Sequence, residues 1–273
     1  MLNSIMNFII FIWARISQML GNFAKLFFII HFKLFPEKRY RLPRESAPLL
    51  KVSCKEEISP ILWQTNYTPD VTLSLYVNYL WNRLMAPGHM YRFLDDAACH
   101  EYVRVNFPES VLRSYERLQV GAAKADFWRV LAVLNEGGVY MDLDAALCWP
   151  PCYFFRNGQK ELLLRMGDGR LTNYCFAATA GHPLLQNISE QIQRNITDNT
   201  TDNVFEMTGP GVFQQFDDPN SFNIVSSRLV CRQGQFTNKN LQYPKRLDMY
   251  WVNQQREMKI LKETEYKMNG EVK

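Results

Sequence analysis

The feature that most constrains the fold is a helix that runs through two glycines into a short strand, between residues 121 and 144. The stretch GAAKADFWRVLAVLNEGG has apolar residues at the spacing of one helical face, and Gly137 and Gly138 end it. The stretch that follows, VYMDLD, alternates apolar and polar residues, which is the pattern of a strand. A helix joined so directly to a strand is typical of an α/β fold.

Segments on both sides continue this alternation. The predicted strands are ISPILWQT at 58–65, MYRFLDD at 90–96, ELLLRM at 161–166 and the first part of 173–196. The predicted helices are 71–85, 97–105, 108–116, the second part of 173–196, and one opened by the turn TGPGVF at 208–213. We therefore expect an α/β fold with a mainly parallel central sheet, in one domain at 51–273 whose charged tail from Arg256 is helical or mobile.

Two carboxylates, Asp142 and Asp144, end the strand of the central unit. Residues two apart in an extended strand point to the same side, so we expect both carboxylates to face one way. The carboxyl ends of strands are where open α/β sheets bind ligands. Like charges held together call for a cation, and oxygen ligands suit Mg²⁺ or Mn²⁺, which usually also hold substrate phosphates. The pair predicts a divalent metal site for a phosphorylated ligand.

The context of this pair matters, because a chain with about a dozen aspartates contains one Asp-x-Asp by chance roughly half the time. Asp126 and Arg129 lie three residues apart on the preceding helix and share one of its faces. The full pattern is K-A-D-x-x-R, then two further helical turns, then G-G-x-Y-x-D-x-D. It is far rarer by chance than Asp-x-Asp alone. We expect these residues to belong to one site, with a plain surface ion pair as the alternative for Asp126 and Arg129.

Charge is distributed unevenly along the chain. Residues 1–51 hold eight basic and two acidic side chains, a net +6, which leaves −2 for the remainder of a chain whose total is +4. The globular body is therefore not basic, which argues against nucleic acid as a partner. The six cysteines show no zinc-binding spacing, and we expect them to be reduced and buried.

The segment 1–50 reads as a basic, amphipathic arm with a linker at 36–48. Its polar residues form one narrow stripe at helical spacing, which predicts one helix, or two with a break near Gly21. Such a helix beside a polybasic cluster, here EKRYRLPR, is typical of peripheral membrane contact. Packing on its own domain and a true span are the alternatives, although the longest uncharged stretch ends at Ala14 and a span needs about 20 apolar residues. The segment has no obvious cleavage site of small residues, so a secretory signal peptide is not favoured.

The central stretch AAKADFWRVLAVLNEGGVYMDLD resembles the DXD sugar-binding region of glycosyltransferase family 32, which includes fungal initiating mannosyltransferases and bacterial polysaccharide and lipopolysaccharide transferases. ISPILWQT and MYRFLDD are similar to the family's first two strands, and NYCFAATAGHP and TGPG to its downstream segments. The resemblance covers roughly 58–212. It implies a GT-A-type nucleotide-sugar-binding fold, and retaining, metal-dependent transfer of a hexose or N-acetylhexosamine from a nucleotide-diphosphate sugar.

The resemblance also implies roles for four catalytic residues. Asp144 would bind the metal, Mn²⁺ or Mg²⁺, and Asp142 would contact the ribose or reach the ion through water. Asp126 and Arg129 would hold hydroxyl groups of the donor sugar. These roles agree with the chemistry, since a departing diphosphate needs its charge neutralised and an oxocarbenium-like state needs fixed polar contacts.

Six further residues are implied at the donor. Trp63 would lie near the base with Gln64 and Thr65 around the nucleotide, Tyr140 would line the pocket, and Asn173 would serve the sugar or acceptor side. Family members often carry a His and a Trp near the C-terminus that close over the diphosphate. This chain has Trp251 in MYWVNQ with no histidine nearby, so Trp251 is the candidate for that role. Trp63 and Tyr140 have the core as their alternative.

The partners that follow are a UDP- or GDP-sugar donor and a glycan or glycolipid acceptor, in the synthesis of cell-surface polysaccharide or lipopolysaccharide. We expect the protein at the cytoplasmic face of the inner membrane, with the lumenal side of a Golgi-type membrane as the alternative. Two other functions compete. One is a catalytically inactive nucleotide-sugar- or carbohydrate-binding relative. The other is a haloacid-dehalogenase-type phosphatase. The motif of that class has Thr or Val two residues after the second Asp, where this chain has Ala146.

Overall fold

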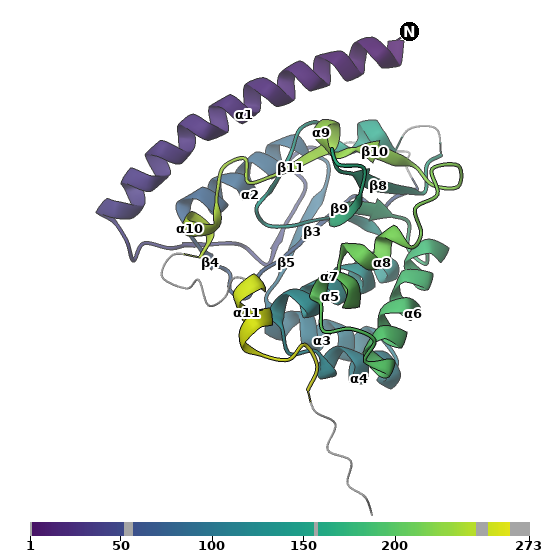
Figure 1. Cartoon of the computed structure of the whole chain (residues 1–273). Helices are drawn as coiled ribbons and strands as arrows, with labels where there is room; N and C mark the ends of the chain where they lie inside the picture. The colour runs from purple at the N-terminus through teal and green to yellow at the C-terminus, as the bar shows by residue number, and fades with distance from the viewer. Residues whose placement is uncertain (1, 52–56, 156–157, 244–250, 263–273) are drawn as a thin grey trace, which may run out of the picture.

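The computed structural model describes residues 2–51, 57–155, 158–243 and 251–262. Among them, seven strands form one central sheet in the order β10-β8-β9-β6-β3-β5-β2 (Figure 1). The strands are β2 (Glu45–Ser46), β3 (Ile61–Thr65), β5 (Met90–Leu94), β6 (Gly138–Met141), β8 (Glu161–Arg165), β9 (Leu171–Ala178) and β10 (Ile224–Ser226). The fold is α/β, as predicted.

The sheet is mixed, and its parallel part that carries the site consists of the neighbouring strands β6, β3 and β5. Strand β3 pairs parallel with both β5 and β6, which is the arrangement expected for strands joined by helices. Strand β9 then runs antiparallel to β6 and to β8, and β2 runs antiparallel to β5. The carboxyl ends of β3, β5 and β6 therefore meet at one edge, which is where the functional site lies.

Helices cover both faces of the sheet. They are α2 (Leu73–Met85), α3 (Asp96–Asn106), α4 (Glu109–Arg117), α5 (Gly121–Glu136), α6 (Pro183–Asp198), α7 (Val204–Met207), α8 (Pro210–Gln214), α9 (Ser227–Val230), α10 (Lys239–Gln242) and α11 (Trp251–Glu257), with a 3-10 turn at Pro151–Phe154. Figure 1 shows α3 to α6 together on one side of the sheet. Alternating strand residues divide between the two layers: Trp63 and Tyr140 pack with α5, while Leu62 and Val139 face the layer that contains α2.

The α5–β6 unit forms as the sequence predicts. Helix α5 is buried along most of its length, and Gly137 caps it with a φ of +71°. Gly138 follows with a φ of +109°, and a Cβ there would come within 2.7 Å of the Ile61 carbonyl oxygen on β3. Both positions therefore require glycine, the first for backbone conformation and the second also for the close approach of two strands.

The N-terminal segment is one continuous helix, α1 (Leu2–Leu34), without the break considered near Gly21. It packs against α2, α9 and α10, and Gly21 faces the domain. A Cβ on Gly21 would lie 2.4 Å from the Gln235 carbonyl oxygen, so the glycine allows close contact and does not interrupt the helix. By length and apolar composition alone, Ser4–Leu34 is the one stretch of the described chain that could cross a membrane.

The predicted linker at 36–48 and the region after residue 144 differ from expectation. The linker contributes β1 (Tyr40–Arg41), which pairs with β4 (Asp70–Val71), as well as β2 of the central sheet. The arm is thus built into the domain. A second short ladder joins β7 (Ala145–Leu147) to β11 (Cys231–Gln233), two segments whose pairing no local pattern predicts. The five described cysteines are free and four are buried, as expected; Cys54 lies outside the described residues.

Candidate active site

The Asp pair lies on a turn and not on a strand. Strand β6 ends at Met141, after which the Asp142 amide donates to the Tyr174 carbonyl oxygen at 2.7 Å. The Ala145 amide donates to the Asp142 carbonyl oxygen at 3.0 Å and closes the turn, and β7 begins at Ala145. The prediction that strand alternation aims Asp142 and Asp144 to one side is therefore wrong. The turn nevertheless brings both to one cavity.

Three side chains hold the Asp142 carboxylate. Its Oδ1 accepts from the Tyr140 hydroxyl at 2.8 Å and lies 3.2 Å from Nη1 of Arg129. Its Oδ2 accepts from Nε2 of Gln233 at 3.0 Å. The donors come from β6, α5 and β11, so the orientation of Asp142 depends on segments about 100 residues apart.

Asp126 and Arg129 form a buried pair behind this carboxylate. Nη2 of Arg129 lies 3.1 Å from Oδ1 of Asp126, and the same oxygen accepts from Nδ2 of Asn173 at 2.9 Å. The Thr208 hydroxyl donates to Oδ2 of Asp126 at 3.4 Å. Burial, reinforced by the charge of Asp142, raises the pKa of Asp126 to about 6 although Arg129 opposes the shift. The pair is no surface ion pair.

Arg129 is the centre of the network. Its guanidinium lies over the Tyr140 ring, 4.6 Å from the ring centre, and its Nη1 donates to the Asn173 carbonyl oxygen at 3.0 Å. It therefore links α5, β6, β9 and the turn that carries Asp142. The structure brings together all four residues predicted as catalytic, since Asp144 lies on the same turn, together with Tyr140 and Asn173.

A cavity of about 440 Å³ opens in front of this network. Its lining includes Thr65, Tyr140, Arg129 and both aspartates of the pair. The rest of the lining is Asn66, Tyr67, Asp96, Gln119, Gly121, Ala122, Lys124, Ala125, Leu143, Gln233, Gln242, Tyr243 and Gln254. A cavity of this size and polarity suits a nucleotide-sized polar ligand.

Three of the residues predicted at the donor do not line the cavity. Trp63 is 1% exposed, donates from its indole to the Gly137 carbonyl oxygen at 2.9 Å and packs edge-on against Trp128. Gln64 is buried and donates to the Asp142 carbonyl oxygen at 3.2 Å, so it supports the turn. The expected contact of Trp63 with a base is thus corrected to a core role. Asn173 does not line the cavity and reaches the site through its hydrogen bond to Asp126. Trp251 begins α11, and its side chain lies outside the described part.

The residues fit a divalent ion, although the described chain offers no cluster of three or more His, Cys, Asp or Glu. Burial, and next the charge of Asp142, raises the pKa of Asp144 to about 7. A doubly charged cation between the two carboxylates would relieve this cost. Mg²⁺ commonly takes one or two protein carboxylates and completes its shell with substrate phosphates and water, which matches a site with two aspartates on an open cavity.

Four of the residues at the site that the sequence analysis did not identify are Asp96, Lys124, Thr208 and Gln233. Asp96 and Lys124 line the cavity, and local signals could have found them, because Asp96 ends a predicted strand and Lys124 opens the K-A-D-x-x-R run. Thr208 lies in the TGPG turn that the resemblance already included. No sequence pattern indicated Gln233, because only the pairing of β11 with β7 brings it to Asp142.

Comparison with known proteins identifies the part of the chain that contains the DXD turn. Residues 61–162 match the family described as "Glycosyltransferase sugar-binding region containing DXD motif". The chain is similar to the initiation-specific alpha-1,6-mannosyltransferase of Schizosaccharomyces pombe, at 27% identity over 58% of this chain and 47% of that protein. It is also similar to the protein of the same name in Candida albicans, at 23% identity over 65% of this chain and 58% of that one. The chain thus spans about half the length of these curated relatives.

Among solved structures, the PaToxG glycosyltransferase is similar at 17% identity and a TM-score of 0.46, over 77% of this chain and 78% of that one. The region 61–162 that matches this family contains β3, β5, α5, β6 and the DXD turn, which are the elements that build the site. The DXD region and the two related sequences support the resemblance to glycosyltransferase family 32.

Proposed function

We propose that this chain is a metal-dependent glycosyltransferase that moves a sugar from a nucleotide-diphosphate donor to a glycan or glycolipid acceptor. The observation that carries the proposal is the meeting of Asp142 and Asp144 at one cavity, above a buried Asp126–Arg129 pair. A solvated strand end would need no such support. Here three donors fix one carboxylate and burial raises the pKa of the other.

Asp144 and Asp142 would hold the ion, Mn²⁺ or Mg²⁺. When bound, the ion supplies Lewis-acid neutralisation of the charge that develops on the leaving diphosphate. Tyr140 and Gln233 keep Asp142 in place. Arg129, held by Asp126 and stacked on Tyr140, presents a fixed positive charge to the cavity. Preorganised charge of this kind stabilises a charge-separated transition state more than the ground state.

We propose that the reaction retains the configuration of the sugar by attack of the acceptor on the face from which the diphosphate leaves. The carboxylates of the described cavity lining are the DXD pair and Asp96. The pair is assigned to the ion, and Asp96 lies beside Lys124. Intact-mass analysis after incubation with donor alone tests this proposal. A covalent glycosyl adduct on any side chain would contradict it.

The donor and acceptor are proposed in order of support. Both curated relatives are named as mannosyltransferases, so a mannosyl donor is the first to test, ahead of other hexoses and N-acetylhexosamines as UDP- or GDP-sugars. A glycan of cell-surface polysaccharide or lipopolysaccharide is the proposed acceptor.

We propose peripheral membrane attachment through α1, because most of its large apolar side chains are exposed over its whole length. The proposed site is the cytoplasmic face of the inner membrane, with a Golgi-type lumenal face as the alternative.

A panel of nucleotide sugars incubated with the protein and Mn²⁺ tests the proposal. A transferase hydrolyses its preferred donor slowly without acceptor, and we expect released nucleoside diphosphate from one donor and none after chelation by EDTA. Binding without any turnover would indicate an inactive relative. Release of inorganic phosphate from phosphate monoesters would indicate a phosphatase.

A further inference from the structure

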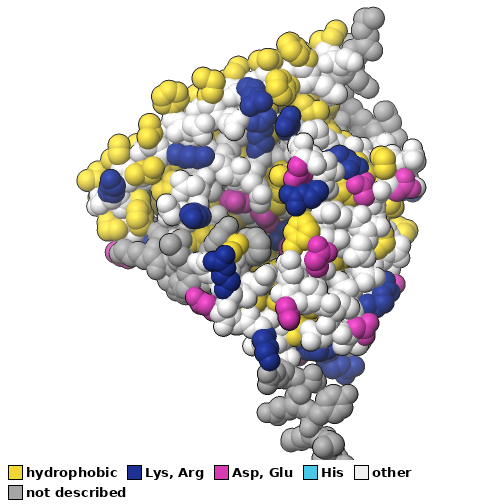
Figure 2. Space-filling view, in the orientation of Figure 1, with side chains coloured by type: hydrophobic (Ala, Val, Ile, Leu, Met, Phe, Trp, Pro, Cys, Tyr) yellow, Lys and Arg dark blue, Asp and Glu magenta, His cyan; other side chains and the backbone are white. Residues whose placement is uncertain are grey.

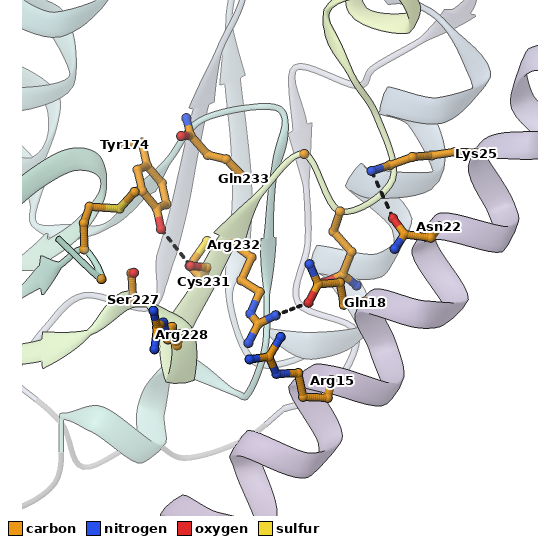
Figure 3. Close-up of a pocket in the computed structure, with 14 residues that line it drawn as sticks. Arg15, Gln18, Asn22, Lys25, Tyr174, Ser227, Arg228, Cys231, Arg232 and Gln233 are labelled. Carbon is orange, nitrogen blue, oxygen red and sulfur yellow. Dashed lines mark hydrogen bonds between the residues drawn. The ribbon is translucent and has the colours of Figure 1, made fainter.

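A second cavity, of about 370 Å³, lies between α1, α9 and β11 (Figure 3). Four basic side chains line it, Arg15 and Lys25 from α1, Arg228 from α9 and Arg232 from β11, and its lining contains no Asp or Glu. In Figure 3, Arg15 and Arg232 extend toward each other across the gap between α1 and β11. A concave site with one sign of charge concentrates the field and attracts anions.

The four charges are not neutralised within the described chain. None of the four forms an ion pair with a carboxylate among the described residues. Two of them contact neutral amides: Arg232 donates to Oε1 of Gln18, and Lys25 donates to Oδ1 of Asn22 at 3.3 Å (Figure 3). Surface arginines and lysines gathered in one hollow without a counter-charge repel one another. An anion removes that cost.

A buried amide gives a second, independent indication of a ligand. Gln235 lines the same cavity and is 3% exposed, and neither its Nε2 nor its Oε1 has a hydrogen-bond partner among the described residues. A buried amide without partners costs about 1–3 kcal/mol, so such groups normally face a ligand or water.

The outer face of α1 indicates where the anion comes from. Its exposed large apolar side chains are Ile5, Phe8, Ile9, Ile12, Ile16, Met19, Leu20, Phe23, Leu26, Phe27, Ile29, Ile30 and Leu34. At 100° per residue, nearly all of them lie opposite the packed face marked by Ala14 and Gly21, while Arg15 and Lys25 lie on the flank. Figure 2 shows this apolar edge along α1 with basic groups just beside it. An apolar face flanked by cations matches the acyl and phosphate layers of a bilayer.

We propose that this cavity binds the phosphate of a membrane lipid headgroup while the outer face of α1 lies in the bilayer interface. The inference rests on the membrane attachment proposed above and adds a specific headgroup site to it. Guanidinium groups match phosphate oxygens in geometry, which gives the site selectivity for phosphate over other anions.

The site adjoins the donor cavity. Gln233 lines both cavities, and the Gly234 amide donates to the Asp144 carbonyl oxygen at 2.9 Å. A lipid phosphate bound here would lie next to the strand β11 that helps to hold the DXD turn. The membrane surface and the donor would thus sit on two sides of one short strand.

Vesicle binding of the full chain tests the proposal without requiring turnover or donor. The vesicles are phosphatidylcholine with phosphatidate, or with fatty acid at a matched surface potential. The cavity variant is Arg15→Gln with Arg228→Gln, two exposed residues outside the donor cavity. The control is Lys33→Gln with Lys239→Gln, which removes the same charge from α1 and from the body, away from the cavity. Thermal unfolding of each variant checks that it folds.

We expect the wild type to prefer phosphatidate vesicles, and we expect the cavity variant to lose about ten-fold more of this binding than the control. Equal binding of the wild type to both vesicle types, or an equal loss in both variants, would overturn the headgroup site and leave only nonspecific attraction. Displacement by a few millimolar inorganic phosphate would assign the cavity to a soluble phosphate and overturn the lipid source. Nucleotide binding with Mn²⁺, measured in the same preparations, keeps a failure here separate from a failure of the proposed transferase.

Discussion

The guanidinium of Arg129 lies 3.2 Å from the carboxylate of Asp142, which joins the middle of helix α5 to the turn after strand β6. The same guanidinium pairs with Asp126 at 3.1 Å. One cation therefore balances two buried or half-buried carboxylates. The K-A-D-x-x-R helix and the DXD turn are two halves of one electrostatic unit, and the following predictions test that unit and its supports.

Replacement of Arg129 tests the pairing. We expect Arg129→Met to lower the free energy of unfolding by about 3–5 kcal/mol, because it leaves Asp126 and Asp142 without their cation. Urea denaturation measures this loss. The control is Arg104→Met, which breaks an exposed pair with Glu101 and should cost less than about 1 kcal/mol. Similar losses of unfolding free energy in the two variants would show that the buried ion pairs of Arg129 contribute no more to stability than an exposed pair.

Removal of one hydroxyl tests the orientation of Asp142. Tyr140→Phe keeps the ring beneath Arg129 and removes only the donor to Oδ1 of Asp142. We expect a loss of about 1 kcal/mol in stability and about ten-fold in turnover, since a loosened carboxylate holds the ion less well. Circular dichroism and donor hydrolysis measure the two effects. Wild-type turnover in this variant would remove Tyr140 from the site.

Docking of α1 can be tested at its closest contact. Alanine is a better helix former than glycine by about 1 kcal/mol, so Gly21→Ala should stabilise an isolated helix. Here the added Cβ would meet the Gln235 carbonyl oxygen at 2.4 Å, and we expect faster proteolysis within α1 together with a lower melting temperature. Leu20→Ala, at the exposed neighbouring position, exchanges two good helix formers and should change neither. A stabilised Gly21→Ala protein would mean that α1 does not pack as described.

Acid stability should depend on His89. Burial, and then the charge of Arg83, lowers the pKa of His89 from 6.5 to about 4. Between these values His89 binds more protons in the unfolded chain than in the folded one, so its contribution to stability is present above pH 6.5 and is lost as the pH drops toward 4. The loss from this group is about 3 kcal/mol, while the raised pKa values of Asp126 and Asp144 act in the opposite direction. Chemical denaturation of the wild type and of His89→Gln at several pH values isolates it, as the change between pH 6.5 and 4 in the difference between their free energies of unfolding. A difference that stays constant over this range would contradict the assignment to His89.

The parts of the fold that local patterns encode were predictable. Helix α5 with its glycine cap, the strands β3 and β5, and the helices α3 and α4 follow from apolar spacing and end signals within each segment. The helix α1 was predictable, but the choice between one helix and two was not, because glycine usually weakens a helix interior and only the tertiary contact with Gln235 explains a glycine at position 21. The strands in the presumed linker depend on partners far along the chain.

The candidate site divides in the same way. Asp126, Arg129, Asp142 and Asp144 lie within 19 residues of one another, so spacing and resemblance were sufficient to group them. The strand expected to carry the aspartates ends early because the Asp142 amide pairs with Tyr174 and the chain turns. Gln233 and Thr208 reach the network only through tertiary contacts. Trp63 is the opposite case. Its position in the motif predicted contact with the donor, but its ring packs against Tyr102 and Trp128 in the core.

The most direct test of the account is Mn²⁺-dependent donor hydrolysis by Asp144→Asn, compared with Asp202→Asn, which changes an exposed aspartate that is not part of the cavity lining. If Asp144 holds the ion against the leaving diphosphate, the first variant should remain folded and lose about 10²–10³ in turnover together with Mn²⁺-dependent nucleotide binding, while the second keeps both. Undiminished hydrolysis and metal dependence in Asp144→Asn would contradict the central claim.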